Sequence, residues 1–372
     1  MHPDKTSERG LRTAVLIFLC AKVLVLWFGV QAALIMTNTS LPANWLHIWN
    51  QWDSLHYVSI AENGYQSTGE ARSSIVFYPL FPWLTRIVKF VARDTVTAGV
   101  IVATLASFAA AFLLYRLAQH DDEHRPRAID TVLFLSIFPT SYFLHIAYTE
   151  SLFLALTLAS FLFARRERWA LAGVAGAFAA LTRVNGVLLI PALMVEAWLQ
   201  WRRTRKFDPR WLWIFFVASG LGVYLAVNKK VAGSWFAFRI YMREVFDRKG
   251  LDFPWVSIYD AWLSVWERAP YDAIMVGWQE LLFTLIAIAV CVWSWLRLRA
   301  SYATWATLNV LLFTSTGFLL GAPRYCLTLF PVYFCFAQVT EGRPVLRSVI
   351  VLWSVLWLGM FEALFVGGKW AF

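Results

Sequence analysis

An aspartate flanked by aromatic residues follows the first long apolar stretch of the chain, in the run Trp52-Asp53-Ser54-Leu55-His56-Tyr57. A carboxylate beside hydrocarbon is costly, and proteins that keep one there usually do so for function. A positioned carboxylate can take the proton of an attacking hydroxyl, which is general base catalysis. We therefore take Asp53 as the candidate catalytic base. Its neighbours are candidate substrate-binding residues: Trp52, His56 and Tyr57.

The next part of the same segment carries a second acid and an aromatic run with two prolines. Glu62 precedes Asn63-Gly64-Tyr65, and residues 77–82 read Phe-Tyr-Pro-Leu-Phe-Pro. Because proline lacks the N–H that a regular helix needs, this run is expected to form a rigid aromatic edge. Glu62 and Tyr78 are therefore further candidates for substrate binding.

Three other segments carry polar groups beside apolar stretches: Ala147-Tyr148-Thr149-Glu150, Thr182-Arg183-Val184-Asn185-Gly186 and Gly321-Ala322-Pro323-Arg324-Tyr325. Arginine suits phosphate because its planar fork makes bidentate, charge-assisted hydrogen bonds. Arg324 is also expected to open a helix, whose first amides favour anions. The candidates for binding a phosphate group are Arg324, Arg183 and Tyr325. The candidates for holding the rest of the substrate are Tyr148, Glu150 and Asn185.

Each charged candidate also has a structural explanation. Asp53 can lie in the first turn of a helix, favour its dipole and complete a capping box with Asn50. Glu150 and Arg183 can form an ion pair with each other. Arg324 can reach out to lipid headgroups along its apolar stem. The sequence alone leaves these alternatives open.

The composition indicates an integral membrane protein. Hydrophobic residues make up 59% of the 372 positions and charged residues 15%, against roughly 25% charge in a soluble domain. The net charge of +10 is explained by Lys and Arg in short cytoplasmic loops, so nucleic acid is not expected as a partner. The four cysteines fit neither a disulfide framework nor a zinc site, and no metal or cofactor is expected.

Apolar stretches of about 17 to 25 residues predict an all-α transmembrane bundle of about eleven spans with the N-terminus inside. The predicted spans are 13–36, 96–118, 129–146, 149–164, 169–183, 187–201, 211–230, 273–296, 302–319, 324–340 and 345–366. This order puts the short arginine-rich turns on the inner side, as the positive-inside rule requires. It puts the candidate site residues on the outer side. We expect a single domain over 1–372.

Two long outer segments, 37–95 and 231–272, are predicted to contain helices that lie in the membrane interface. Residues 50–63 read as a short helix that Gly64 ends. In 76–92 one helical face carries basic residues and the other is apolar, as is typical of an interfacial helix. That apolar face consists of Trp83, Ile87, Phe90 and Val91. The segment 231–272 is rich in aromatic residues, which favour the same depth.

The first-segment motif resembles the first luminal loop of the PIG-V-type (GPI mannosyltransferase 2-like) mannosyltransferases, which add the second mannose of the GPI anchor. The resemblance continues through 147–153, Thr182-Arg183-Val184-Asn185-Gly186 and Arg324-Tyr325, and so covers most of the chain. It implies the GT-C superfamily of multi-span enzymes that use a polyprenyl-phosphate sugar donor. It gives Asp53 the acidic position of the first outer loop. The compact length implies a prokaryotic member, for which GPI need not be the acceptor.

Together these features predict a transferase that moves a hexose, with mannose favoured, from a polyprenyl-phosphate donor to a lipid or glycan acceptor with inversion. It would act among membrane lipids at the outer face of a prokaryotic plasma membrane, or in the endoplasmic reticulum lumen of a eukaryote. The alternative is a flippase or transporter of lipid-linked sugars, whose fold often shows paired repeats and broken helices at mid-membrane. The candidate groups gather instead at one face, with only Lys22 inside a span, which favours an enzyme.

Overall fold

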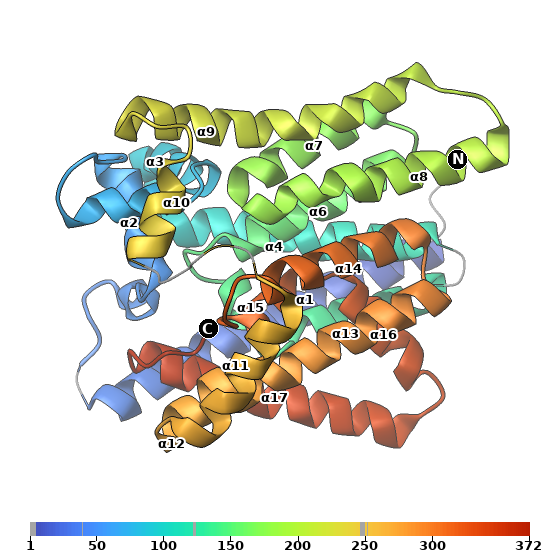
Figure 1. The fold of residues 1–372 in the computed structure, drawn as a ribbon. Coiled ribbons are helices and arrows are strands. Elements are labelled where there is room, and N and C mark those ends of the chain that lie inside the picture. The colour runs from blue at the N-terminus through green and yellow to red at the C-terminus, as the bar shows by residue number, and fades with distance from the viewer. Residues whose placement is uncertain (1–4, 39, 122–123, 246–249, 251) are drawn as a thin grey trace.

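The computed structural model describes residues 5–38, 40–121, 124–245, 250 and 252–372, and every regular element in these ranges is a helix. Long helices run alongside one another in a bundle, and α2, α3 and α10 gather at one end of it (Figure 1). One large hydrophobic core extends through the bundle, from Ala14 near its start to Phe372, and Leu80, Leu181 and Tyr224 form a smaller second cluster. The predicted all-α class is confirmed.

Within the described residues, six helical stretches are long and apolar enough to cross a membrane. They are Arg9–Thr37, Thr95–His120, Val184–Thr204, Pro209–Ala232, Pro270–Arg297 and Pro344–Val366. Three of the stretches are single helices: α1 (Lys5–Thr37), α4 (Thr95–His120) and α17 (Pro344–Val366). Two others each combine a short helix and a longer one: η5 (Val184–Leu188) with α8 (Leu189–Thr204), and η6 (Pro209–Val217) with α9 (Ala218–Ala232). The last combines α12 (Pro270–Asp272), the π-helix η7 (Ala273–Trp278) and α13 (Gln279–Arg297). The chain is an integral membrane protein.

Shorter helices complete the bundle. They are η3 (Arg125–Arg127), α5 (Ala128–Ser136), η4 (Ser141–Leu144), α6 (Glu150–Arg165), α7 (Trp169–Thr182), α14 (Ala300–Thr314), α15 (Ala322–Thr328) and α16 (Pro331–Thr340). α6 packs between α4 and α7, and α15 packs on α13. These contacts bring the starts of α6 and α15 toward the same interior.

Two of the predicted spans are not continuous helices. The expected span 129–146 becomes α5, an irregular stretch and η4, and the expected span 324–340 becomes α15 and α16. Pro139 and Pro331 lie at the breaks, where a residue without an N–H cannot continue a helix. Residues 138–150 are all buried. Irregular backbone at membrane depth is tolerated only where protein or an aqueous cavity surrounds it.

The first outer segment contains η1 (Trp45–Trp49), α2 (Asp53–Asn63), η2 (Glu70–Val76) and α3 (Leu80–Ala92), and η2 meets α3 at a bend of 113°. The predicted apolar face of α3 is exposed, with Phe90 and Val91 each 86% accessible. On the other face, Arg86 donates to the carbonyls of Ile60 and Ala61, 3.3 and 2.7 Å away, and fixes α3 to α2. Gly64 ends α2 as predicted.

The second outer segment also contains helices, as its composition predicts. They are α10 (Ala237–Glu244), α11 (Pro254–Glu267) and α12, while residues 246–249 and 251 lie outside the described ranges. α11 packs on the η7–α13 stretch. Its aromatic side chains are largely exposed, among them Trp255 at 63% and Trp266 at 66%.

Candidate active site

Four charged side chains from four separate segments meet in the interior. The Arg324 Nη1 group donates to Asp53 Oδ2 at 2.7 Å, and Arg324 Nε lies 3.3 Å from Glu150 Oε1. Arg183 Nη1 donates to that same Glu150 oxygen. We call these four residues the charge cluster. Its two carboxylates balance its two guanidiniums, which is what allows so much charge to be buried together.

Asp53 is the first residue of α2, and the residue before it, Trp52, has a strained backbone conformation. Trp52 has φ 53 and ψ −121, in a region that a bulky residue adopts only when its surroundings enforce it. Its indole donates to the carbonyl of Lys369 at 3.3 Å and its ring packs edge-on against Trp370. The helix therefore begins at Asp53 rather than at Asn50 as expected. The capping-box alternative is wrong, because Asn50 accepts from Ser54 instead.

Arg324 lies in the first turn of α15 and is 13% exposed. Its guanidinium lies over the rings of Phe143 and Tyr148, 5.5 and 5.7 Å from their centroids, so cation–π contacts add to its ion pairs. It is buried against these partners, so the headgroup alternative does not describe it. The backbone amides before it are already taken: the Glu280 carboxylate accepts from them. The first amides of α15 therefore do bind an anion, as expected, but this anion is a carboxylate of the chain itself.

Arg183 ends α7, and a close turn brings it back over the helix. A Cβ on Gly186 would lie 2.2 Å from the Ala180 nitrogen, so only glycine allows this approach. Arg183 also donates to Thr149 Oγ1 at 3.1 Å and lies 5.7 Å from the Tyr325 ring centroid. The predicted ion pair with Glu150 is confirmed.

Glu150 holds the cluster together. Its side chain is 1% exposed, and its Oε1 atom contacts both guanidiniums. Its Oε2 atom has no hydrogen-bond partner among the described residues. A buried carboxylate oxygen in this situation is a ready acceptor for a hydroxyl group.

Two tyrosines border the cluster. The Tyr57 hydroxyl lies 3.5 Å from Thr149 Oγ1, and the Tyr148 hydroxyl donates to the carbonyl of Gln51 at 3.0 Å. Burial raises the pKa of the Tyr57 phenol well above its ordinary value, and the charge of Asp53 adds to the effect. The phenol therefore stays protonated and neutral.

His56 contacts residues of η2 and of the turn that follows it. Its ring stacks on Phe77 with centroids 4.6 Å apart, and its Nδ1 lies 3.0 Å from Ser74 Oγ. Burial lowers the pKa of His56, while the negative charge of Asp53 opposes this shift. A neutral imidazole beside Asp53 adds no further positive charge to the two guanidiniums of the charge cluster at neutral pH.

Three other predicted substrate contacts are engaged within the protein. Glu62 accepts from Thr95 at 2.6 Å and pairs with Lys89, which ties α2 to α4 and α3. Tyr78 stacks on Tyr224, with ring centroids 3.9 Å apart. Asn185 donates to Asn309 Oδ1 at 2.8 Å. Their roles toward a substrate stay predictions, since each contact has a packing function of its own.

Several buried polar groups were not predicted from the sequence. Lys22 is not the only ionisable residue inside a span: Glu196, Glu280 and Glu362 are also buried there, each at most 1% exposed. Averaged hydropathy hides one acid among many apolar neighbours. The signal that could have found Glu280 is an acid placed directly before a long apolar run. Thr149 and Phe143 were missed as cluster neighbours because their types are common in cores.

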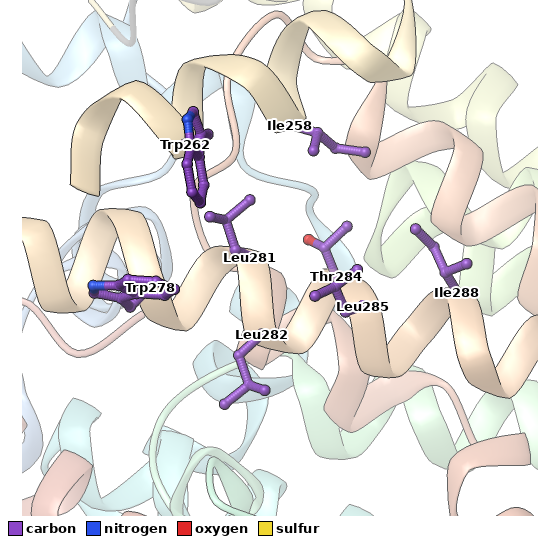
Figure 2. Close-up of a pocket in the computed structure, with 8 residues that line it drawn as sticks. All are labelled: Ile258, Trp262, Trp278, Leu281, Leu282, Thr284, Leu285 and Ile288. Atoms are coloured by element: carbon purple, nitrogen blue, oxygen red, sulfur yellow. The ribbon is translucent and has the colours of Figure 1, made fainter. Parts of the chain in front are cut away.

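No group of three or more His, Cys, Asp or Glu residues positioned to hold a metal occurs in the described ranges. A groove of about 250 Å³ lies elsewhere, between α11 and α13. Figure 2 shows Ile258 and Trp262 of α11 facing Leu281 and Leu285 of α13 across it. Thr284 is its one hydroxyl-bearing lining residue, so the groove suits an apolar chain.

The sequence profile of the dolichyl-phosphate-mannose-protein mannosyltransferases matches residues 78–227. GPI mannosyltransferase 2 of Schizosaccharomyces pombe is 28% identical over 143 residues, which is 37% of this chain and 30% of that protein. GPI mannosyltransferase 2 of Cryptococcus neoformans var. neoformans is 28% identical over 159 residues, 40% of this chain and 36% of that protein. These findings confirm the predicted resemblance to the PIG-V-type family. The matched regions span only about a third of these relatives' lengths.

The overall fold is similar to that of a solved structure. The structure of ArnT from Cupriavidus metallidurans, solved bound to undecaprenyl phosphate, aligns with a TM-score of 0.52 at 13% identity over 95% of this chain and 76% of that one. In this chain, the profile match includes Glu150 and Arg183 and leaves out Asp53 and Arg324. The meeting of these four residues is therefore an observation of the structure itself.

Proposed function

We propose that this protein is a membrane glycosyltransferase of the GT-C type, which moves mannose or a related hexose from a polyprenyl-phosphate donor to a lipid-linked or cell-envelope acceptor. The observation that carries the proposal is the charge cluster, in which a carboxylate able to act as a base contacts a guanidinium able to bind phosphate. The names of the relatives support mannose as the sugar. The undecaprenyl phosphate bound to ArnT supports a polyprenyl carrier.

The proposed reaction inverts the configuration of the sugar. A hydroxyl of the acceptor attacks the anomeric carbon while the bond from that carbon to the phosphate oxygen breaks, through an oxocarbenium-like state. The hydroxyl proton passes to Asp53, and the bonding electron pair leaves with the polyprenyl phosphate. Because a phosphate leaves as an anion, the leaving side needs fixed positive charge rather than an acid. Arg324 supplies this charge, with Arg183 beside it.

The resting contact between Asp53 and Arg324 gives the donor a second task. In the resting protein the Asp53 carboxylate accepts from Arg324, so this oxygen is not free to accept from an acceptor hydroxyl. The donor phosphate would compete for the Arg324 fork and release Asp53 toward the acceptor hydroxyl. Donor binding would thus prepare the base, and the free oxygen of Glu150 would accept from a sugar hydroxyl.

The groove between α11 and α13 would hold part of the polyprenyl chain. Its lining is apolar, and Leu281 and Leu282 directly follow Glu280, which contacts the helix that carries Arg324. We place the reaction at the outer face of a prokaryotic plasma membrane, on the strength of the predicted charge distribution of the loops.

The decisive experiment incubates the purified protein with radiolabelled polyprenyl-phosphate mannose, or other sugars on the same carrier, together with total membrane lipid. A new glycosidic bond in detergent solution is expected. A carrier of lipid-linked sugars would form no such bond under these conditions. If none of the donors yields a product while the protein remains folded, the proposed function is wrong.

A further inference from the structure

The buried carboxylate of Glu280 has no part in the chemistry described so far. It lies in the first turn of α13 and its side chain is fully buried. Its Oε1 accepts the Gly321 amide at 2.6 Å, and its Oε2 accepts the Ala322 amide at 2.7 Å. Charge-assisted bonds of this kind are short and strong, and a buried carboxylate needs them. Both oxygens are thus aimed at one short piece of backbone.

That piece of backbone directly precedes Arg324. Gly321 has φ 92, a left-handed conformation that glycine adopts most readily, and its carbonyl accepts the Tyr325 amide at 2.9 Å. The carbonyl of Pro323 accepts from Thr140 Oγ1 at 3.0 Å. The turn that carries Arg324 is therefore held from two sides, by α13 and by the irregular stretch after α5.

We infer that Glu280 is a positioning residue, which acts through the amides of Gly321 and Ala322 to set the Arg324 guanidinium against Asp53 and Glu150. This inference rests on the proposed role of Arg324 toward the donor phosphate. α15 has only seven residues, so its orientation depends on contacts such as these rather than on its own length. A misplacement of about 1 Å at a reacting group can cost about 10²-fold in rate.

The same turn of α13 also faces the apolar groove. Leu281 and Leu282, which follow Glu280, are among its lining residues (Figure 2). A polyprenyl chain in the groove would therefore lie against the turn that fixes the phosphate ligand. Glu280 would thus fix the position of Arg324 relative to the groove that holds the polyprenyl chain.

The test uses binding of undecaprenyl phosphate to the purified protein in detergent, measured for wild type, Glu280→Gln and Arg324→Lys. Glutamine replaces one carboxylate oxygen by an NH₂ group that cannot accept from an amide, so one of the two backbone bonds is lost. We expect Glu280→Gln to bind undecaprenyl phosphate about tenfold more weakly, because a displaced Arg324 would lose roughly one hydrogen bond to the phosphate. In the Arg324→Lys background it should add little, because residues that act through one another are not additive.

A matched control removes a different contact between the same two helices. Cys326 of α15 contacts the carbonyl of Phe283 of α13 at 3.4 Å, and Cys326→Ala should leave undecaprenyl phosphate binding unchanged. Glu280→Asp keeps the charge but is one methylene shorter, and should bind with intermediate affinity. It replaces Glu280→Gln as the test if the glutamine variant does not fold.

The possible failures are distinguishable. If wild type does not bind undecaprenyl phosphate, the proposed function falls. If wild type binds and the Glu280 variants bind equally well, the positioning role falls. The positioning role falls also if the effects of Glu280→Gln and Arg324→Lys simply add, because a general structural role would then explain both.

Discussion

The Asp53 carboxylate and the Arg324 guanidinium are 2.7 Å apart although 271 positions separate them in the chain. Asp53 is 24% exposed and Arg324 13%, so the pair is partly screened from solvent. Their contact, extended by Glu150 and Arg183, is what turns a membrane bundle into a candidate for chemistry on a phosphate-linked substrate.

Replacing Asp53 by Asn should separate binding from catalysis. Transfer is expected to fall by about 10² or more, as for loss of a general base. Undecaprenyl phosphate should bind at least as tightly as in wild type, because Arg324 no longer has this competing anion. Initial transfer rates and equilibrium binding of the carrier measure the two effects.

The control for this variant is Asp94→Asn, which alters another acid of the first outer segment. Asp94 caps α4 through the Thr97 amide, a bond that asparagine can also accept. Wild-type transfer is expected there. A wild-type transfer rate in the Asp53→Asn variant would show that Asp53 is not the catalytic base.

Replacing Arg324 by Lys should weaken donor use. Lysine keeps the positive charge that Asp53 and Glu150 require, but it loses the planar fork. The donor KM should rise about tenfold, the equivalent of one charge-assisted hydrogen bond. Arg347→Lys, at a more exposed ion pair with Asp130, should leave it unchanged. An unaltered donor KM in the Arg324 variant would indicate a purely structural arginine.

Glu150→Gln should be the most destabilising single change within the charge cluster. It leaves two neighbouring buried guanidiniums with only Asp53 to balance them, a loss of roughly 3 kcal/mol by analogy with broken buried ion pairs. Thermal unfolding in detergent measures this. Glu167→Gln removes a pair that is 70% and 48% exposed, and should change stability very little. Equal melting temperatures for the two variants would contradict the structural role of Glu150.

The pKa of His56 predicts a pH dependence of stability. Burial lowers it below the ordinary value of 6.5, so the unfolded chain takes up a proton at a higher pH than the folded chain does. Stability should therefore be unaffected by this group above about pH 6.5 and should decline as the pH falls below that value. In His56→Gln, the melting temperature should fall less steeply between about pH 7 and pH 5. An identical slope in both proteins would refute this contribution.

Local patterns predicted much of the structure of residues 37–95 and one ion pair of the charge cluster. The exposed face of α3 was identified from the helical spacing of Trp83, Ile87, Phe90 and Val91. The opposite charges of Glu150 and Arg183 identified an ion pair. The sequence could have marked Glu280 as an acid beside an apolar run, but not its partners, because these are backbone amides of a distant helix that share no pattern with it. Apolar runs also hid the breaks at Pro139 and Pro331, since hydropathy measures burial and not helix continuity.

The oxygen that Glu150 shares between Arg183 and Arg324 has an evolutionary consequence. A lineage that neutralised the acid alone would inherit two adjacent cations, and one that lost either cation would strand the acid. Viable descent should therefore pass through paired replacements. Homologous sequences are expected to retain this trio intact or to exchange its members together.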